Sequence, residues 1–230
     1  MKILTIIPAY NEENTIGEVV HQVKYNFPSA DILVINDGSR DNTSIRAKDA
    51  GAIVVDLPFN LGIGGAMQTG FLFAKREGYD IAVQVDGDGQ HDPFYIKKLI
   101  EPIEKGTADM VIGSRYISRS SYKSSTLRRA GMILLSIMVS LLVRQKLKDT
   151  TSGFRAVSRK VIDYFSENYP VDYPEVDVIV RLYKRKIRIT ELPVEMLIRQ
   201  SGISSITPLR SVYYMLKVSL SVIIGSVRTR

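Results

Sequence analysis

Residues 81–92 read Ile-Ala-Val-Gln-Val-Asp-Gly-Asp-Gly-Gln-His-Asp. Residues 81–85 are apolar or neutral, and a continuous run of this kind is typical of a strand buried on both faces of a parallel sheet. Asp86 and Asp88 follow the run directly. Because open α/β sheets bind their ligands at the carboxyl ends of the strands, the stretch predicts both a fold class and the place of a site.

The same alternation of short apolar runs and helical patterns fills the first half of the chain. We expect strands at Ile3–Pro8, Asp31–Asn36, Ala52–Asp56, Ile81–Val85 and Met110–Gly113. We expect helices at Glu12–Tyr25, Asp41–Ala50, Gly65–Glu77 and Pro93–Glu104, with caps at Asn11, at Ser39 or Asp41, and at Asp92. This order predicts an α/β fold with an open, doubly wound sheet and helices on both faces.

Beyond Gly113 the alternation stops. We expect a Ser/Lys/Arg-rich loop at 118–125, an apolar helix at 127–146, a polar loop at 149–160, a strand at 187–196 broken at Pro193, and an amphipathic helix at 209–227. Neither apolar helix is expected to span a bilayer, which needs roughly 20 apolar residues. Broad apolar faces flanked by cations favour helices that lie in the membrane interface, with core packing or dimer contacts as the plainer alternative.

Composition and charge narrow the chemistry. With no cysteine and only two histidines in 230 residues, disulfides and thiolate metal sites are excluded, so a bound metal would have oxygen ligands, which suits Mg²⁺ or Mn²⁺. Residues 1–114 hold 10 Lys and Arg against 16 Asp and Glu (net −6), whereas residues 115–230 hold 21 against 8 (net +13). The basic half suits phosphorylated ligands, an acidic membrane surface or nucleic acid, unless its charges are simply solvated.

The segment Asp86-Gly87-Asp88 carries the strongest sign of chemistry. Its two carboxylates at a strand end repel each other unless a cation lies between them. A metal held there would neutralise the oxygens of a diphosphate and stabilise a nucleotide as leaving group. A Gly/Asp turn is the structural alternative, and a calcium loop is disfavoured because the spacing that would continue to a Glu ligand is absent.

Further motifs lie at the ends of the expected strands. They are Pro8-Ala9-Tyr10-Asn11-Glu12, residues 36–43, Asn60-Leu61-Gly62-Ile63-Gly64-Gly65-Ala66 and residues 86–93. In this order and spacing the chain resembles the family 2 glycosyltransferases. Residues 113–116, 149–155 and 199–205 make it similar to the polyprenyl-phosphate sugar synthases of the dolichol-phosphate mannose synthase type.

This resemblance covers nearly the whole chain and implies a GT-A type nucleotide-sugar-binding sheet, mostly parallel, with C-terminal amphipathic helices that associate with a membrane. Residues 1–114 would then form the half that binds the nucleotide-sugar and the metal. Residues 115–208 would form the acceptor-binding half of the same catalytic domain, and residues 209–230 the C-terminal amphipathic helix.

The resemblance also implies roles for individual residues on the donor side. Asp37 would accept hydrogen bonds from the edge of the base, although this chain has Asn36-Asp37 where family members usually show two aspartates. The residues expected to bind the nucleotide-sugar are Pro8, Tyr10, Glu12, Asp37, Gly64, Asp86 and Arg199. The expected metal ligands are Asp86, Asp88 and Gln90.

On the acceptor side, Arg115 and Arg129 would grip a phosphate, since a guanidinium can bind phosphate through two parallel hydrogen bonds. The expected acceptor-phosphate set is Arg115, Arg129, Ser136 and Arg155, and the expected catalytic set is Asp88, Arg115, Arg129 and Asp149. Asp149 is a candidate base. A lipid phosphate, with a second pKa of about 6 by analogy with phosphoserine, is already ionised, so positioning and charge stabilisation could suffice without a base.

We therefore expect an inverting, metal-dependent enzyme that uses Mg²⁺ or Mn²⁺ to move a sugar from a nucleotide-diphosphate sugar to a polyprenyl phosphate. A UDP-sugar is preferred, with a GDP-sugar as the other choice. One alternative is a family 2 enzyme that extends a cell-surface polysaccharide on a saccharide acceptor. The other is a catalytically silent binding module, which the intact Asp86 and Asp88 pair argues against.

No export signal is expected, because Met1-Lys2 leads directly into the first strand. We expect a cytoplasmic protein, peripheral at the inner face of the cell membrane. The expected partners are the donor, the polyprenyl phosphate, the membrane surface, and either a small membrane protein or a second copy of the chain, but no nucleic acid.

Overall fold

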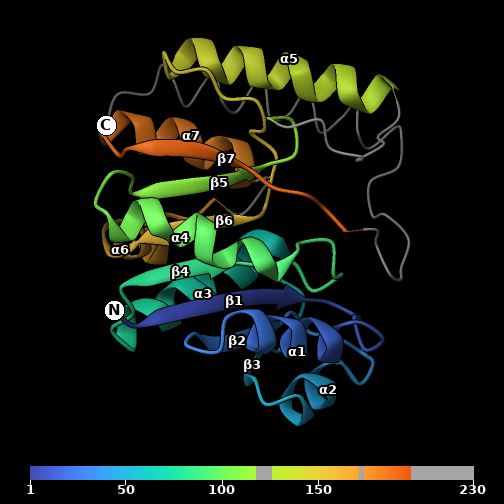
Figure 1. Cartoon of the computed structure of the whole chain (residues 1–230). Helices are drawn as coiled ribbons and strands as arrows, with labels where there is room; N and C mark the ends of the chain where they lie inside the picture. The colour runs from blue at the N-terminus through green and yellow to red at the C-terminus, as the bar shows by residue number, and fades with distance from the viewer. Residues whose placement is uncertain (118–125, 171–173, 198–230) are drawn as a thin grey trace.

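The computed structural model describes residues 1–117, 126–170 and 174–197, apart from the side chains of residues 126–130. One seven-stranded sheet runs through the molecule in the order β3-β2-β1-β4-β6-β5-β7 (Figure 1). The strands are β1 (Ile3–Ala9), β2 (Asp31–Asn36), β3 (Ile53–Asp56), β4 (Ile81–Gln84), β5 (Met110–Ser114), β6 (Arg155–Ser158) and β7 (Ile189–Pro193). Only β6 runs antiparallel to its neighbours, so the mostly parallel sheet is confirmed.

Helices cover both faces of this sheet, as predicted. They are α1 (Ile16–Asn26), α2 (Thr43–Asp49), α3 (Gly62–Arg76), the 3-10 turn η1 (Pro93–Tyr95), α4 (Ile96–Glu104), α5 (Thr126–Leu142), α6 (Arg159–Asn168) and α7 (Pro174–Lys184). On one face α1, α2 and α4 bury residues such as Val20, Ala47 and Leu99 against the strands. On the other face α3, α5, α6 and α7 form a second core, and α5 runs along the β7 edge of the sheet (Figure 1).

The strands predicted for residues 1–114 are confirmed to within one residue at either end. The first helix begins later than predicted, and Asn11 does not cap it. Asn11 has a positive φ of 54°, and its side-chain oxygen accepts the Arg40 N–H at 2.9 Å. The cap at Asp92 is confirmed, since Asp92 accepts the Phe94 N–H at 3.0 Å, but the N-cap of α2 is Asn42, and Asp41, one position earlier, accepts the Thr43 N–H at 3.0 Å.

The second half departs more from expectation. The polar loop predicted at 149–160 is wrong from Arg155 onward, where β6 and the start of α6 lie. Arg155 can be buried inside the sheet because its guanidinium donates to the carbonyls of Thr150, Ser152 and Glu175. The strand interrupted at Pro193 is confirmed, since β7 ends there, and the apolar helix is confirmed with an earlier end at Leu142.

The predictions for residues 118–125 and 209–230 concern segments outside the described residues. No helix in the described ranges combines the length and the apolar composition that crossing a bilayer requires. The boundary expected at residue 114 falls at the end of β5, inside the continuous sheet, so the two halves share one fold.

Candidate functional site

A cavity of about 170 Å³ opens at the carboxyl ends of β1 and β4, where the sheet topology predicts a ligand. Its walls come from β1 and the turn after it, from the start of α3, from β4 and the turn after it, and from the start of α7. They are lined by Pro8, Glu12, Ile63, Gln84, Asp86, Gly87, Asp88 and Glu175. The sequence prediction named Pro8, Glu12, Asp86 and Asp88 for this site, and the structure brings these residues together.

The turn after β4 is held in shape by its own side chains. The Asp86 N–H donates to His91 Nδ1 at 3.0 Å, and His91 Nε2 lies 3.4 Å from Asp86 Oδ2. Since Nδ1 accepts a hydrogen bond, Nε2 is the ring nitrogen that can donate, and it faces the carboxylate. Asp88 Oδ1 accepts the Gln90 N–H at 3.0 Å. These bonds leave both carboxylates beside the cavity.

The donor atoms of this turn fit a hard divalent cation. In the described ranges no three or more His, Cys, Asp or Glu side chains are arranged to hold a metal by themselves. Asp86 and Asp88 therefore suit a metal whose remaining ligands come from a diphosphate and water, as is usual for Mg²⁺ and equally open to Mn²⁺. Gln90 is half-buried beside the turn, and the metal role expected for its side chain stays a prediction.

The loop between α5 and β6 reaches the turn after β4 through Gly153. A Cβ atom at Gly153 would lie 3.0 Å from Gln84 Nε2 and 3.3 Å from Asp86 Oδ1. Both distances are tighter than most Cβ contacts, so a larger residue at 153 would push these two side chains aside by a few tenths of an ångström, which glycine avoids. The ring of Phe154 stacks on His91, with centroids 4.8 Å apart. The loop predicted to face the acceptor is thus packed against the carboxylate predicted to hold the metal.

A second cavity, of about 630 Å³, lies at the carboxyl ends of β2 and β3. Tyr10 and Phe59 both line it and are both exposed, as suits stacking against a flat ring. Asn36 also lines it, and its Nδ2 donates to Asp56 Oδ1 at 2.8 Å. An aspartate at position 36 would place two carboxylates in contact, which explains why asparagine is tolerated here.

Asp37 has a different environment from the one expected. Its oxygens accept the backbone N–H groups of Leu61 at 2.7 Å and Gly62 at 2.9 Å, at the start of α3. Burial raises the pKa of its carboxyl, and these two N–H groups oppose that rise. Asp37 therefore holds the start of α3 beside the cavities, and direct contact with a base stays a prediction. Gly64 is buried in the first turn of the same helix.

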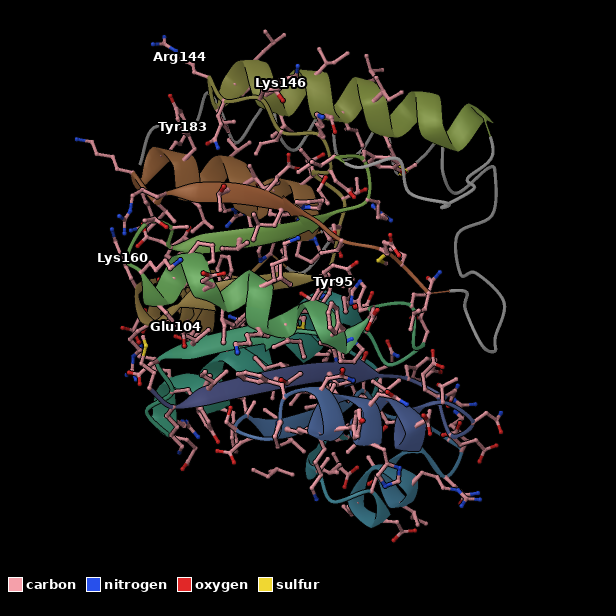
Figure 2. The ribbon with its side chains drawn as sticks, viewed as in Figure 1. Tyr95, Glu104, Arg144, Lys146, Lys160 and Tyr183 are labelled. Atoms are coloured by element: carbon pink, nitrogen blue, oxygen red, sulfur yellow. The ribbon has the colours of Figure 1, made fainter. Side chains whose placement is uncertain are left out.

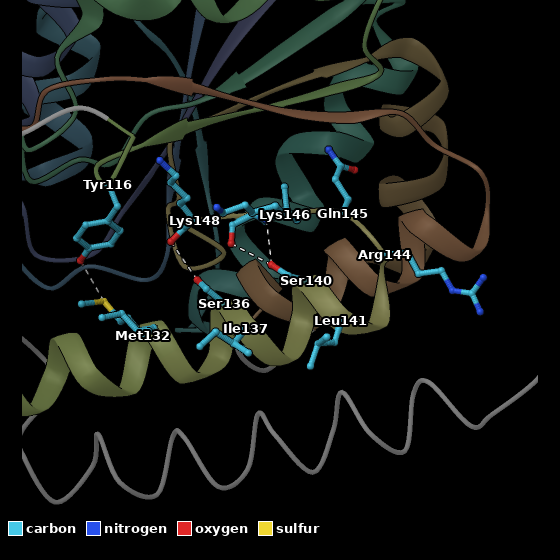
Figure 3. Close-up of a pocket in the computed structure, with 12 residues that line it drawn as sticks. Tyr116, Met132, Ser136, Ile137, Ser140, Leu141, Arg144, Gln145, Lys146 and Lys148 are labelled. Carbon is cyan, nitrogen blue, oxygen red and sulfur yellow. Dashed lines mark hydrogen bonds between the residues drawn. The ribbon is translucent and has the colours of Figure 1, made fainter.

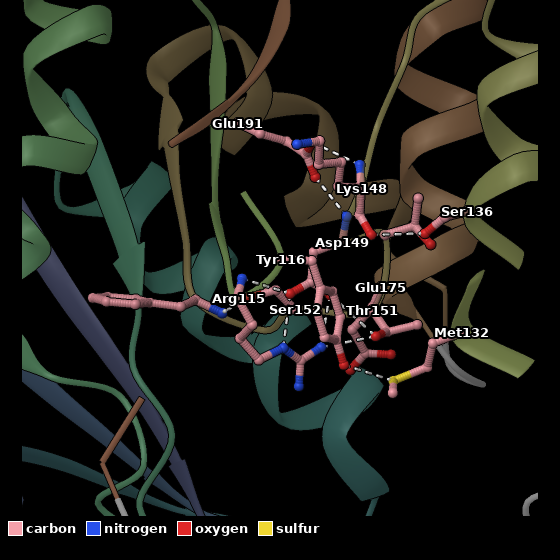
Figure 4. A network of polar contacts seen from close by, with 12 residues as sticks. Arg115, Tyr116, Met132, Ser136, Lys148, Asp149, Thr151, Ser152, Glu175 and Glu191 are labelled. Carbon is pink, nitrogen blue, oxygen red and sulfur yellow. Dashed lines mark hydrogen bonds and ion pairs between the residues drawn. The ribbon is translucent and has the colours of Figure 1, made fainter. Parts of the chain in front are cut away.

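Arg115 and Asp149 form a buried ion pair (Figure 4). Arg115 donates from its backbone N–H and from Nε to Asp149 Oδ2, at 2.9 and 2.7 Å, and from Nη2 to Oδ1 at 2.7 Å. Nη2 also donates to Thr151 Oγ1 at 2.9 Å. Because both Asp149 oxygens accept hydrogen bonds from Arg115, the geometry favours an anchoring role for Asp149 over that of a base.

Of the remaining residues predicted for the acceptor phosphate, Ser136 and Arg155 make contacts within the protein. Ser136 was expected to contact the phosphate, but its Oγ donates to the Lys148 carbonyl at 3.0 Å (Figure 3). Arg155, whose bonds to carbonyls are given above, organises its loop and the start of α7. The side chain of Arg129 and the whole of Arg199 lie outside the described residues, so their roles stay predictions.

Glu175 is a site residue that the sequence analysis missed. It lies in the first turn of α7, which was not predicted as a helix, and it lines the smaller cavity with Asp86 and Asp88. Burial raises the pKa of its carboxyl, the charge of Arg155 opposes the rise, and Asp86 adds to it. His91 was likewise quoted within its motif but given no role. In neither case did the local pattern differ from that of an ordinary helix start or turn.

An apolar groove of about 520 Å³ runs between α5 and residues 144–148 (Figure 3). Tyr116, next to Arg115, lines one part, and Met132, Ile137 and Leu141 of α5 continue it. Basic residues lie at its rim; Arg144 is at the end of α5 and points away from the ribbon (Figure 2). Ile133, Leu134, Ile137 and Leu141 of α5 are all more than half exposed.

Comparison with known proteins places the chain in a family. The model of "Glycosyl transferase family 2" matches residues 5–165. A UDP-N-acetylglucosamine–dolichyl-phosphate N-acetylglucosaminyltransferase of Methanococcus voltae is 33% identical over 213 residues, which cover 84% of each chain. An undecaprenyl-phosphate mannosyltransferase of Micrococcus luteus is 31% identical over 220 residues, covering 90% of this chain and 84% of that one.

Solved structures agree on the fold. The glucosyl-3-phosphoglycerate synthase of Mycobacterium tuberculosis, in complex with Mn²⁺, UDP and phosphoglyceric acid, has a TM-score of 0.75 and 21% identity. The match covers 100% of this chain and 81% of that one. The resemblance drawn from the sequence motifs, including the polyprenyl-phosphate subgroup, is confirmed by these matches. The chain belongs to glycosyl transferase family 2.

Proposed function

We propose that this chain is an inverting glycosyltransferase that moves a sugar from a nucleotide-diphosphate sugar to a polyprenyl phosphate. The observation that carries the proposal is the contact between the two sites. One loop reaches both: its Gly153 lies against Asp86, and its Asp149 pairs with Arg115. Two relatives are named for transfer to a lipid phosphate, which supports the same acceptor class here.

On the donor side, Tyr10 and Phe59 would hold the base in the larger cavity, and the diphosphate would lie beside Asp86 and Asp88. A divalent cation bound by these carboxylates, Mg²⁺ or Mn²⁺, would neutralise the leaving diphosphate. A UDP-sugar is the preferred donor, with a GDP-sugar as the alternative. The name of one relative and the UDP in a structural neighbour support this preference.

On the acceptor side, Arg115 would bind the lipid phosphate, held in orientation by Asp149. A phosphate oxygen attacks the anomeric carbon, the bond from that carbon to the diphosphate breaks, and its electron pair leaves with the nucleoside diphosphate. The attacking oxygen is already ionised, so the residues need only position it and stabilise charge. The configuration at the anomeric carbon inverts.

The lipid chain would run from Tyr116 along the groove beside α5. The exposed apolar residues of α5, next to Arg144 and Lys146, suit a helix that lies on an anionic membrane surface. We therefore propose a peripheral protein at the cytoplasmic face of the membrane, with residues 1–114 serving the donor and 115–208 the acceptor. We also propose that residues 209–230 contribute to membrane binding, together with either a small membrane protein or a second copy of the chain.

One observation favours the alternative of a saccharide acceptor. A sugar hydroxyl needs a base, and Glu175 supplies a carboxyl of raised pKa inside the cavity. In a lipid-phosphate enzyme the same side chain would instead contact the hydroxyls of the donor sugar. The identity of the acceptor therefore decides whether Glu175 acts as a base or contacts the donor sugar.

The test incubates the full chain with Mn²⁺ or Mg²⁺, a panel of UDP- and GDP-sugars, and polyprenyl phosphate, and measures labelled lipid. We expect product with at least one donor. Asp88→Ala should lower transfer by roughly 10³-fold or more, because the leaving diphosphate loses its charge partner. The matched control is Asp49→Ala, an exposed aspartate on α2.

Circular dichroism of each variant checks folding, and calorimetry with UDP checks donor binding. Glycosylation of free saccharides with no lipid product would give the alternative first place. An Asp88→Ala variant that stays active would contradict the metal role of the Asp86-Gly87-Asp88 turn.

A further inference from the structure

We propose that Glu191 is a positioning residue for the acceptor-phosphate site: it fixes the backbone of Lys148 and Asp149, so that Asp149 holds Arg115 in its binding orientation. The inference rests on the proposed function, because it concerns the same acceptor site. It adds a residue on β7 that neither the sequence motifs nor the cavities point to.

The first link joins β7 to the loop that follows α5. Glu191 Oε2 accepts the Lys148 N–H and Oε1 accepts the Asp149 N–H, each at 2.7 Å (Figure 4). Both oxygens of one carboxylate thus bind two consecutive backbone groups. Hydrogen bonds to a carboxylate are shorter and stronger than those between neutral groups, so these two bonds restrain the backbone of the loop at Lys148 and Asp149.

The second link joins Asp149 to Arg115. The side chain of Asp149 uses both oxygens on the Arg115 guanidinium, and its backbone is the group that Glu191 holds. Arg115 also lies at the carboxyl end of β5, which pairs with β7 beside Glu191. A shift of the loop would therefore turn the guanidinium relative to the strand that carries it.

The loop is also held from the opposite side, by α5. Ser136 Oγ donates to the Lys148 carbonyl at 3.0 Å, and Ser140 Oγ donates to the Leu147 carbonyl at 3.1 Å and accepts the Leu147 N–H at 3.0 Å. These hydrogen bonds join neutral groups, whereas the two hydrogen bonds on the other side go to the carboxylate of Glu191. Burial raises the pKa of the Glu191 carboxyl, and the N–H groups of Lys148 and Asp149 oppose that rise.

The experiment compares Glu191→Gln with wild type in steady-state transfer to polyprenyl phosphate. Glutamine keeps the size of the side chain but turns an NH₂ group toward one of the two backbone N–H groups, so one of the two hydrogen bonds is lost. We expect the KM for the lipid phosphate to rise about tenfold while the KM for the donor stays within about twofold. The matched control, Glu195→Gln, changes an exposed residue of the same segment and should alter neither constant.

A coupling measurement tests whether the effect passes through Arg115. In an Arg115→Lys background, Glu191→Gln should lower kcat/KM for the lipid by less than about twofold, since residues that act as a unit are not additive. Equal losses in both backgrounds, or equal changes in the KM for donor and acceptor, would overturn the proposal in favour of a general structural role.

A second readout does not depend on activity. In ¹⁵N spectra the Nε–H of Arg115, assigned by its loss in Arg115→Lys, should exchange slowly with solvent in wild type and faster in Glu191→Gln. If wild type forms no lipid-linked sugar, the proposed function fails, yet this signal still judges Glu191. Unchanged exchange of Arg115 Nε–H in Glu191→Gln would refute the positioning role.

Discussion

Two ion pairs with the same hydrogen-bond pattern lie at opposite ends of β5. In Arg115–Asp149 and in Arg188–Asp109, the backbone N–H and Nε of the arginine donate to one carboxylate oxygen and Nη2 donates to the other. Asp109 directly precedes β5, and Arg115 directly follows it. The first pair has side chains 8% and 0% exposed, whereas those of Arg188 and Asp109 are 55% and 13% exposed.

The difference lies in what each pair costs the fold. A buried ion pair contributes little net stability, because removing two charges from water offsets their attraction. A pair that keeps its arginine in water, as Arg188 does beside the buried Asp109, costs less to form and is worth little. The Arg115–Asp149 pair stands at the carboxyl end of the strands, where ligands bind, and the Arg188–Asp109 pair, whose arginine is exposed, stands at the amino end. Because its burial adds little stability, we infer that the Arg115–Asp149 pair is present at that end to bind a ligand.

The largest effect is expected from removing each arginine. Arg115→Ala should reduce transfer to polyprenyl phosphate by roughly 10²–10³-fold, as losing a preorganised charge contact does. It should also destabilise the fold by about 3–5 kcal/mol, because Asp149 is left buried without its partner. Arg188→Ala should leave transfer within about twofold of wild type. Initial rates and urea unfolding measure both effects, and comparable losses of activity in the two variants would remove the functional distinction.

A smaller effect is expected from neutralising each aspartate. Asp149→Asn keeps one acceptor oxygen but turns an NH₂ group toward the guanidinium, so Arg115 loses its orientation while remaining present. We expect transfer to fall about 10-fold or more, mainly through a higher KM for the lipid phosphate. Asp109→Asn should not change either kinetic constant. A collapse of kcat with an unchanged acceptor KM in Asp149→Asn would instead indicate that Asp149 acts as a base.

The smallest effect concerns acid stability at the Arg188–Asp109 pair. The hydrogen bonds and charge of Arg188 hold the pKa of Asp109 below its usual value of about 3.9. A depressed carboxyl pKa contributes stability that is present above the pKa of the unfolded chain and is lost as the pH falls through the folded value. Asp109→Asn should therefore be less stable than wild type at pH 5–7, and the difference should vanish well below pH 4. A difference that persists unchanged in strong acid would show that the pair acts through packing.

Much of the donor site follows from local pattern, because its residues come directly after strands. Asp86 and Asp88 follow β4, Pro8 ends the apolar run of β1, and carboxyl ends of parallel strands meet at one edge. Their assembly around one cavity was therefore predictable. Asp37 shows the limit: it follows β2 as the pattern predicts, but its binding to the N–H groups of Leu61 and Gly62 depends on how α3 approaches β2.

The acceptor side was less predictable for a physical reason. Arg155 is charged and lies in a polar stretch, which is typical of a loop, yet carbonyls from α7 and its own loop allow it to begin a strand inside the sheet. Glu175 and Glu191 lie on elements whose short patterns resemble many surface segments. Their roles arise from residues 20 or more positions away in the chain, and periodicity carries no information about such contacts.

The sequence by itself determined the parallel α/β half, the place of Asp86 and Asp88 at a strand end, and the family, since these depend on strand periodicity and on residues fixed at strand ends. Tertiary structure alone decided that Gly153 lies against Asp86, that Asp149 pairs with Arg115, and that Glu191 accepts the backbone N–H groups of Lys148 and Asp149. The reason is that a charged side chain can be buried only where distant backbone and side-chain partners replace water, and those partners exist only once the chain has folded.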